Sequence, residues 1–130
     1  MAGPPTILII DDDPDFVRAT RKVLESVPYR VLAADNGDDG IKMARAEKPD
    51  LILLDIIMPL RDGFSTCEAI KSDPSLEEVP VVMLTSFAQK VAETSLSVSQ
   101  GMALEADDYI DKPVAPAELL KRVARLLSRR

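Results

Sequence analysis

The stretch that decides the fold is Ile7-Leu8-Ile9-Ile10-Asp11-Asp12-Asp13-Pro14. An apolar run of strand length stops at three consecutive aspartates, and the proline that follows suits the first position of a helix. A strand that is apolar at every position is typical of a parallel sheet covered on both faces. The stretch therefore predicts the first strand-to-helix connection of an α/β domain, with acidic residues where the strand ends.

Apolar runs and amphipathic stretches alternate along the rest of the chain. In the amphipathic stretches the apolar residues recur every three to four positions, as they do in helices packed on one side. Such an alternation predicts a doubly wound α/β domain, a (βα)5 fold with a parallel five-stranded sheet of order 2-1-3-4-5 and helices on both faces. The predicted strands are Thr6–Ile10, Tyr29–Ala33, Leu51–Leu54, Val81–Leu84 and Tyr109–Ile110, and the predicted helices are Pro14–Ser26, Asp38–Glu47, Gly63–Ser72, Pro116–Leu127 and, with a loose end, Phe87–Ala106.

Length and charge narrow the classes of function. The chain has 130 residues, which fits a single domain over residues 1–130 with no effector domain. It carries 16 Lys and Arg against 22 Asp and Glu, a net charge of -6, and no histidine. The missing imidazole excludes a Ser-His-Asp triad, a histidine metal cluster and a phosphohistidine on this chain. Because an acidic chain is repelled by polyphosphate, we expect no direct nucleic-acid binding.

The compartment is also indicated by the sequence. The single cysteine, Cys67, cannot close an internal disulfide, and residues 1–13 lack the basic start and long apolar run of a secretory signal. The longest apolar runs are too short to span a bilayer. We therefore expect a cytoplasmic protein without a membrane segment.

Acidic residues follow two strands that the predicted order makes neighbours. Asp11 and Asp12 follow the first strand, and Asp55 follows the third. In such a sheet the functional crevice lies beyond these strand ends, and carboxylates gathered there repel one another unless a cation or a raised pKa relieves them. Hard oxygen ligands that are few and open to water suit Mg²⁺. The sequence predicts a magnesium site, although Asp11 and Asp12 taken alone have the plainer interpretation of solvated caps.

A hydroxyl and an ammonium follow the last two strands at the same edge of the sheet. Thr85 and Ser86 follow the fourth strand, and Lys112-Pro113 follows the fifth. Each has a plain interpretation in isolation: Thr85 as a strand-end cap, Lys112 as an exposed lysine, and nearby Tyr109 as a half-buried ring with a hydrated hydroxyl. Together with the acids, however, they complete a site that has a cation pocket, a hydroxyl donor and one fixed positive charge.

Four segments in this order resemble the receiver domain of two-component response regulators, of the chemotaxis-regulator kind. The resemblance covers nearly the whole chain and implies a flavodoxin-like fold. Its segments are Ile7 to Pro14 as quoted above, Leu51-Ile52-Leu53-Leu54-Asp55-Ile56-Ile57-Met58-Pro59 with Asp62-Gly63, Met83-Leu84-Thr85-Ser86, and Ala106-Asp107-Asp108-Tyr109-Ile110-Asp111-Lys112-Pro113.

The resemblance implies a phosphoryl acceptor and its metal ligands. Asp55 would accept a phosphoryl group from a partner's phosphohistidine and form an aspartyl phosphate, which a carboxylate nucleophile can do. Asp12 and Asp55 would bind Mg²⁺ with the backbone carbonyl of Ile57, and Asp11 would act largely through metal-bound water. Lys112 would pair with a phosphoryl oxygen, and the Lys112–Pro113 peptide bond would be cis.

The resemblance also implies a switch. The Thr85 hydroxyl would move to the phosphoryl group, and the ring of Tyr109 would turn into the space that Thr85 leaves. The protein would catalyse only its own phosphorylation and dephosphorylation, without turnover of an independent substrate. Its partners would be a sensor histidine kinase or a histidine phosphotransfer protein, and a downstream protein target.

Two features are particular to this chain. The segment between Thr85 and Tyr109 is several residues longer than is usual in the family, so the output surface cannot be carried over from the resemblance. Ile57 and Phe87, the second residues after Asp55 and Thr85, are apolar. Since those positions control the access of water in this family, we expect slow self-dephosphorylation.

Two other functions stay open at this point. A phosphohydrolase of the haloacid-dehalogenase type would use Asp11 as its nucleophile, but it would leave the Asp55 segment unexplained. A receiver-like binding scaffold that never takes phosphate is the other. The sequence alone does not identify the kinase, the target or the oligomeric state, nor does it distinguish a stand-alone protein from a domain of a longer one.

Overall fold

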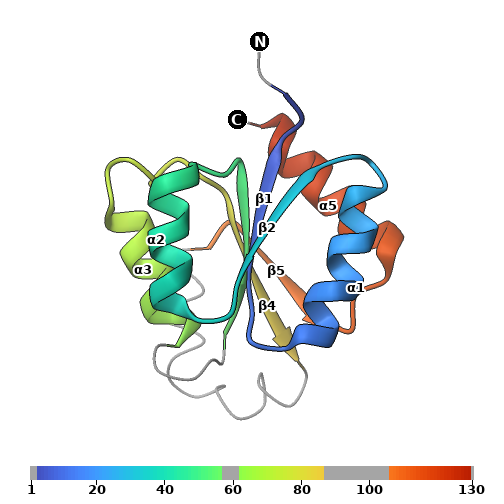
Figure 1. Cartoon of the computed structure of the whole chain (residues 1–130), viewed down its shortest axis with the longest axis horizontal. Coiled ribbons are helices and arrows are strands. Elements are labelled where there is room, and N and C mark those ends of the chain that lie inside the picture. Colours follow the sequence, from blue (N-terminus) through green and yellow to red (C-terminus); the bar gives the residue numbers. More distant parts are fainter. Residues whose placement is uncertain (1–2, 57–61, 87–105, 130) are drawn as a thin grey trace.

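The computed structural model describes residues 3–56, 62–86 and 106–129. Its strands form one parallel sheet in the order β2-β1-β3-β4-β5, as predicted, with helices on both faces (Figure 1). In chain order the elements are β1 (Thr6–Ile10), α1 (Pro14–Glu25), β2 (Arg30–Ala34), α2 (Gly37–Glu47), β3 (Leu51–Asp55), α3 (Gly63–Ser72), β4 (Val81–Ser86), β5 (Asp108–Lys112) and α5 (Pro116–Ser128).

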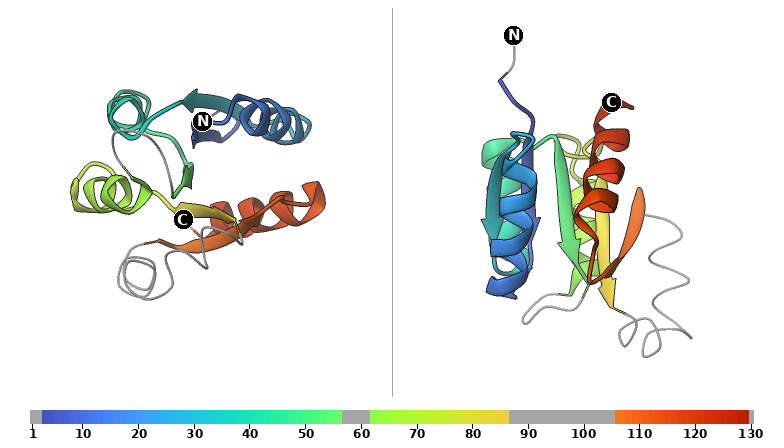
Figure 2. Two further views of the ribbon diagram at one scale, coloured as in Figure 1. Left: turned by 90° about the horizontal axis from the view of Figure 1, so that it is seen from below. Right: turned by 90° about the vertical axis from the view of Figure 1, so that its right-hand side faces the viewer.

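The sheet separates two hydrophobic layers, and Figure 2 shows the helices that cover its two faces. Successive residues of a strand point to opposite faces. In β1, therefore, Leu8 and Ile10 pack with α2 and α3, whereas Ile7 and Ile9 pack with α1 and α5. All four are fully buried, which explains why the strand has no polar alternation.

Aspartates begin two of the helices next to the strand ends. The side chain of Asp13 accepts hydrogen bonds from the backbone N–H groups of Asp15 and Phe16, and Asp62 accepts one from Ser65. These contacts satisfy N–H groups that the first turn of a helix leaves unpaired. Asp13 and Asp62 are therefore the N-caps of α1 and α3, next to the ends of β1 and β3.

The order of the sheet reverses between β1 and β3. From β1 the chain goes to β2 on one side, and it then returns to place β3 on the other side of β1. At such a switch point the connections leave in opposite directions and open a crevice beyond the carboxyl ends of the strands. The acids after β1 and at the end of β3 lie at this point.

Most predicted boundaries are confirmed to within a residue or two. Three strands are longer than predicted, since β3 includes Asp55, β4 continues to Ser86 and β5 spans Asp108–Lys112, and β2 is shifted by one residue to Arg30–Ala34. The helix predicted over Phe87–Ala106 falls on residues 87–105, which lie outside the described residues. None of the helices in the described ranges has the length and apolar character needed to cross a membrane.

Candidate functional site

Three carboxylates meet at the switch point of the sheet. Ile10 at the end of β1 is the register partner of Leu54 in β3, so the next residues, Asp11 and Asp55, are brought together. Asp11, Asp12 and Asp55 each place a carboxylate oxygen within 4.8 Å of the others. Asp11 and Asp55 are 1% and 3% exposed, whereas Asp12 is open to solvent. The predicted convergence of these three acids is therefore present in the structure.

Lys112 brings one positive charge to these acids from the end of β5. Its Nζ lies 2.8 Å from Asp11 Oδ2 and 3.4 Å from Asp55 Oδ1. The same ammonium lies 4.3 Å from the centre of the Phe16 ring in α1, in a cation–π contact. The lysine is thus held in the site rather than exposed. The Lys112–Pro113 peptide bond is cis, as expected.

The site holds more negative charge than Lys112 compensates. Asp11 Oδ2 and Asp55 Oδ1 are buried and have no well-aligned hydrogen bond among the described residues, and the Lys112 ammonium contacts both as ion pairs. Burial, followed by the charge of Asp11, raises the pKa of Asp55 to about 6, although Lys112 opposes the rise. Burial would lower the pKa of Lys112, but Asp11 and Asp55 together outweigh it and raise that pKa.

This arrangement fits a divalent cation. Buried carboxylate oxygens without a hydrogen-bond partner are costly, and a metal ion is a direct way to satisfy them. The ligands are hard oxygens and one of them, on Asp12, faces solvent, which matches the few protein ligands and retained waters of Mg²⁺. The carbonyl of Ile57 lies outside the described residues, and its predicted role as a ligand stays a prediction.

Thr85 and Tyr109 lie on the neighbouring strands β4 and β5, on the face of the sheet that packs with α3. Thr85 is fully buried, and its hydroxyl donates a hydrogen bond to Asp111 Oδ1 at 2.6 Å. The ring of Tyr109 packs against the cluster that contains Cys67 and Met83.

The hydroxyl of Tyr109 is buried and makes no well-aligned hydrogen bond in the described part of the chain. The interpretation of this residue as a ring with a hydrated hydroxyl is therefore wrong, because the hydroxyl end points into the protein rather than to water. Burial raises the pKa of Tyr109 accordingly.

Comparison with known proteins identifies the family. The family model of the response regulator receiver domain matches residues 7–124. The chain belongs to this family. Its match across nearly the whole chain does not favour the haloacid-dehalogenase alternative, which left Asp55 without a role.

Two curated relatives illustrate the range of the family. PilH of Pseudomonas aeruginosa is 36% identical over 94% of this chain and 97% of its own length. The DNA-binding dual master transcriptional regulator RpaA of Synechocystis is 40% identical over 96% of this chain, but over only 50% of its own length. This receiver domain thus spans about half the length of several curated relatives and nearly all of PilH.

Solved structures of receiver domains have the same fold. The receiver domain of a signal transduction histidine kinase from Syntrophus aciditrophicus matches with a TM-score of 0.85 and 32% identity, over 95% of this chain and 90% of that one. The receiver domain of the sensor histidine kinase PA1611 from Pseudomonas aeruginosa, solved with magnesium coordinated in its active-site cleft, matches with a TM-score of 0.85 and 25% identity, over 97% and 99% of the two chains. These relatives are receivers and regulators rather than conventional turnover enzymes.

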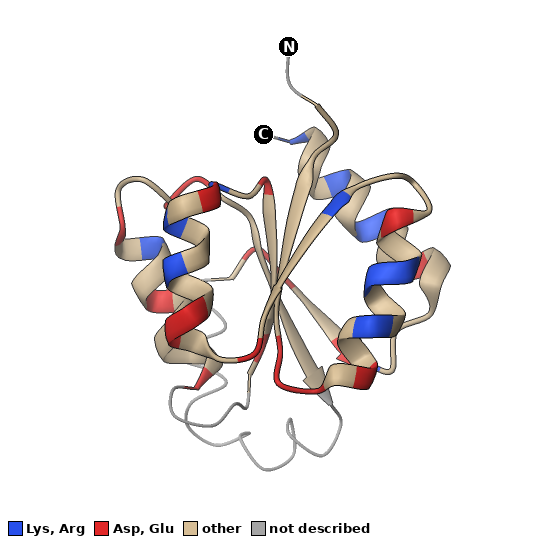
Figure 3. Cartoon of the chain, viewed as in Figure 1, with Lys and Arg blue, Asp and Glu red and all other residues tan. Residues whose placement is uncertain are grey.

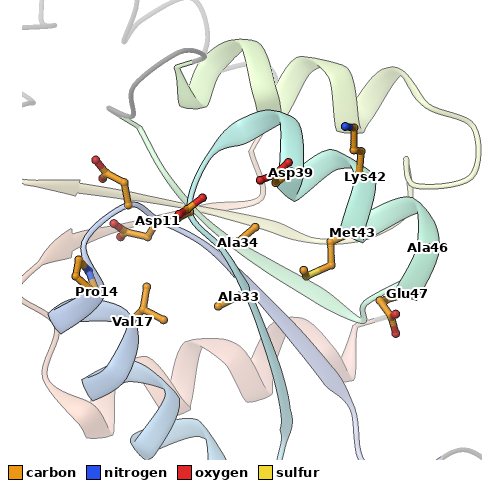
Figure 4. A pocket seen from close by; sticks show the side chains of 12 residues that line it. Asp11, Pro14, Val17, Ala33, Ala34, Asp39, Lys42, Met43, Ala46 and Glu47 are labelled. Carbon is orange, nitrogen blue, oxygen red and sulfur yellow. The ribbon is translucent and has the colours of Figure 1, made fainter.

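Acidic side chains gather along the edge of this receiver domain where the strands end. Figure 3 shows them around the starts of α1 and α2, while the basic residues lie along the length of the helices. A cavity of about 810 Å³ opens from this edge across β2, between α1 and α2. Asp11 and Asp12 form one end of it, and Figure 4 shows Val17 of α1 and Met43 of α2 on either side of Ala33.

The sequence analysis missed three residues that shape the site. A β-carbon at Gly63 would lie 2.3 Å from the backbone oxygen of Asp55, so only glycine lets α3 start this close to the acceptor strand. The Asp62-Gly63 pair was the available signal. Neither the ring of Phe16 under Lys112 nor the contact of Asp111 with Thr85 has a signal in the spacing of the sequence.

Proposed function

We propose that this receiver domain accepts a phosphoryl group on Asp55, in a Mg²⁺-dependent reaction, from the phosphohistidine of a partner protein. The observation that carries the proposal is the state of the Asp55 carboxylate. Its Oδ1 is buried and has no well-aligned hydrogen bond among the described residues, and it lies beside one ammonium and two further acids. A buried carboxylate beside two further acids does not stabilise the fold, but it is well placed as a nucleophile.

Each residue has a defined part in the transfer. An oxygen of Asp55 forms a bond to phosphorus while the bond between phosphorus and the imidazole nitrogen breaks, and the bonding electrons leave with the imidazole. Lys112 stabilises the negative charge that spreads over the phosphoryl oxygens. Asp11, Asp12 and Asp55 would hold Mg²⁺, which neutralises the phosphoryl charge when it is bound.

The aspartyl phosphate would then change which partner the domain binds. Thr85 and Tyr109 are the residues we propose for this step, because Thr85 lies on β4, next to the acceptor strand, and Tyr109 lies on the following strand β5, on the same face of the sheet. Phosphorylation only changes the populations of two conformations that exist before it. Reversing their ratio from 1:99 to 99:1 would need a difference of about 5.5 kcal/mol in interaction free energy between the two conformations. We therefore expect a partial switch.

The donor and the setting are part of the proposal. Two of the similar structures are receiver domains of histidine kinases, which supports a sensor histidine kinase or a histidine phosphotransfer protein as the donor. We propose a downstream protein as the target, a single receiver domain over residues 1–130, and a cytoplasmic location. DNA binding is a property of RpaA that we do not extend to this chain.

Labelling with acetyl phosphate tests this function. In the presence of Mg²⁺ we expect the protein to gain one phosphoryl group, and peptide mapping to find it on Asp55. The Asp55→Asn variant should gain none. The matched control is Asp107→Asn, at an aspartate that pairs with Lys71 far from the site, and it should be labelled as the parent is.

The other outcomes are equally informative. Label on Asp11, with turnover of phosphate esters, would indicate a phosphohydrolase. A folded protein that takes no label under any of these conditions would be a binding scaffold. Either result would overturn the proposed function.

A further inference from the structure

The hydroxyl that we propose for the switch already has a strong partner. Thr85 in β4 and Asp111 in β5 are register partners in the parallel pair, so their side chains lie on the same face of the sheet. Thr85 Oγ1 and Asp111 Oδ1 are 2.6 Å apart, which is short for a hydrogen bond between oxygens. Tyr109 is two residues before Asp111 on the same strand and therefore shares that face.

The direction of this hydrogen bond follows from the number of protons available. A threonine hydroxyl has one proton to donate, and an ionised carboxylate can only accept. Thr85 is therefore the donor and Asp111 the acceptor, in a charge-assisted bond that is stronger than one between neutral groups. The same proton cannot also be donated to a phosphoryl oxygen on Asp55.

We propose that Asp111 is a positioning residue that holds the Thr85 hydroxyl in the unphosphorylated state and so opposes the switch. The proposal rests on the proposed function of Asp55, because the phosphoryl group is the competing acceptor. On phosphorylation the bond to Asp111 breaks and the bond to the phosphoryl oxygen forms. Thr85 donates one hydrogen bond in either state. The free energy of the bond to Asp111 is therefore lost on switching, and it reduces the free energy by which phosphorylation favours the switched state.

Asp111 is the aspartate of this region whose carboxylate accepts the Thr85 hydroxyl. Asp107 pairs with Lys71 and accepts the N–H of Val81, and Asp108 pairs with Arg122 and Arg125. Asp111 itself is exposed. When Thr85 turns away, water can therefore take its place on Asp111, and the cost of switching is one exchanged bond rather than a buried charge left without a partner.

The direct test is a double-mutant cycle between Asp111 and Thr85. The measurement is the apparent affinity for beryllofluoride, an analogue of the phosphoryl group, in saturating Mg²⁺, followed by amide shifts in NMR spectra. We expect Asp111→Ala to raise this affinity about tenfold, the size of a charge-assisted hydrogen bond. Asp111→Asn, which keeps an acceptor oxygen but no charge, should give a smaller gain.

The Thr85→Ala background separates the proposed bond from simple electrostatics. Removing a negative charge near the site would favour an anion whatever Thr85 does, so that effect would persist in Thr85→Ala. The proposed effect requires the hydroxyl and should disappear in that background. The same gain in both backgrounds, or no gain from Asp111→Ala in the parent, would overturn the role of Asp111.

A second measurement is independent of the phosphoryl group. In the metal-free protein, side-chain couplings should report one χ1 rotamer for Thr85 in the parent and averaged rotamers in Asp111→Ala. A single unchanged rotamer in the variant would contradict the proposal even if Asp55 is phosphorylated normally. Conversely, a parent that binds neither beryllofluoride nor a phosphoryl group would overturn the proposed function, and this inference with it.

Discussion

Two lysine side chains of this domain have nearly the same exposed fraction but different roles. The Lys71 side chain is 16% exposed and the Lys112 side chain is 18% exposed. Each also lies less than 3 Å from a carboxylate oxygen, at 2.9 Å from Asp107 for Lys71 and 2.8 Å from Asp11 for Lys112. By burial and distance alone the two ion pairs would be judged alike.

The charged and polar groups around Lys71 all have partners. Its Nζ donates to the backbone oxygen of Val79 at 2.8 Å and contacts that of Glu77 at 3.4 Å. The Asp107 oxygen that it binds also accepts the backbone N–H of Val81. These contacts tie the end of α3 to the starts of β4 and β5, with every charge matched. Lys112 instead contacts two members of a cluster of three acids, and the buried oxygens Asp11 Oδ2 and Asp55 Oδ1 have no well-aligned hydrogen bond in the described part of the chain. The structural ion pair of Lys71 thus differs from the functional ion pair of Lys112 in that all of its contacting polar groups have partners.

Replacing each lysine by alanine should show the difference between the two ion pairs most clearly. Lys112→Ala should slow the phosphorylation of Asp55 by acetyl phosphate about 100-fold, because it removes the fixed charge that stabilises the transferring group. Lys71→Ala should leave that rate nearly unchanged. It should instead lower the free energy of unfolding by about 1–3 kcal/mol, since Asp107 and two carbonyls lose their donor.

Rates of labelling and urea denaturation of both variants provide the measurement. The distinction between the two lysines would be lost if Lys71→Ala slowed labelling as much as Lys112→Ala does. It would also be lost if Lys112→Ala retained the parent rate.

The two acidic partners should respond in opposite directions. In Mg²⁺-free buffer at pH 7, Asp55→Asn should raise the free energy of unfolding by about 1 kcal/mol or more, because it removes a buried charge that repels Asp11. Asp107→Asn should lower it, since a satisfied ion pair is broken. Urea denaturation of the two variants checks this, and a loss of stability in Asp55→Asn would contradict the account.

The gain from Asp55→Asn should also depend on pH. The pKa of Asp55 is about 6 in the folded protein and lies near 3.8 when unperturbed, so the folded state holds its proton more tightly. Between these values the folded state binds more protons than the unfolded state, and the parent loses stability as the pH rises. The gain should therefore shrink towards zero below pH 4 and level off above about pH 7. A gain that is constant from pH 4 to 8 would show that the pKa of Asp55 is ordinary.

The sequence predicted the sheet well because its apolar runs are continuous. The run Ile7 to Ile10 and its counterparts in β3 and β4 are buried on both faces, and nothing else in a short domain requires such runs. Strand β5 was predicted at only two of its residues. Its remaining positions, Asp108, Asp111 and Lys112, are charged because they pair with α5, with Thr85 and with the acids of the site.

The candidate site was predictable only in part, and for a related reason. Asp11, Asp12 and Asp55 follow strands whose order could be inferred, so their convergence could be inferred as well. The contact between Asp111 and Thr85 depends on the register of β4 and β5, which apolar spacing does not define. The orientation of Tyr109 depends on space within the α3 layer, which no single sequence reveals.

The central claim is that Asp11, Asp12 and Asp55 form a magnesium site whose unmatched charge makes Asp55 an acceptor. Calorimetric titration with Mg²⁺ in metal-free buffer tests it most directly, with the parent compared against Asp12→Asn, Asp55→Asn and Asp107→Asn. We predict that one Mg²⁺ binds per chain in the parent and in Asp107→Asn, and that the affinity falls at least about tenfold in the other two variants. A parent that binds no Mg²⁺, or an Asp55→Asn variant that binds it as tightly as the parent, would contradict the account.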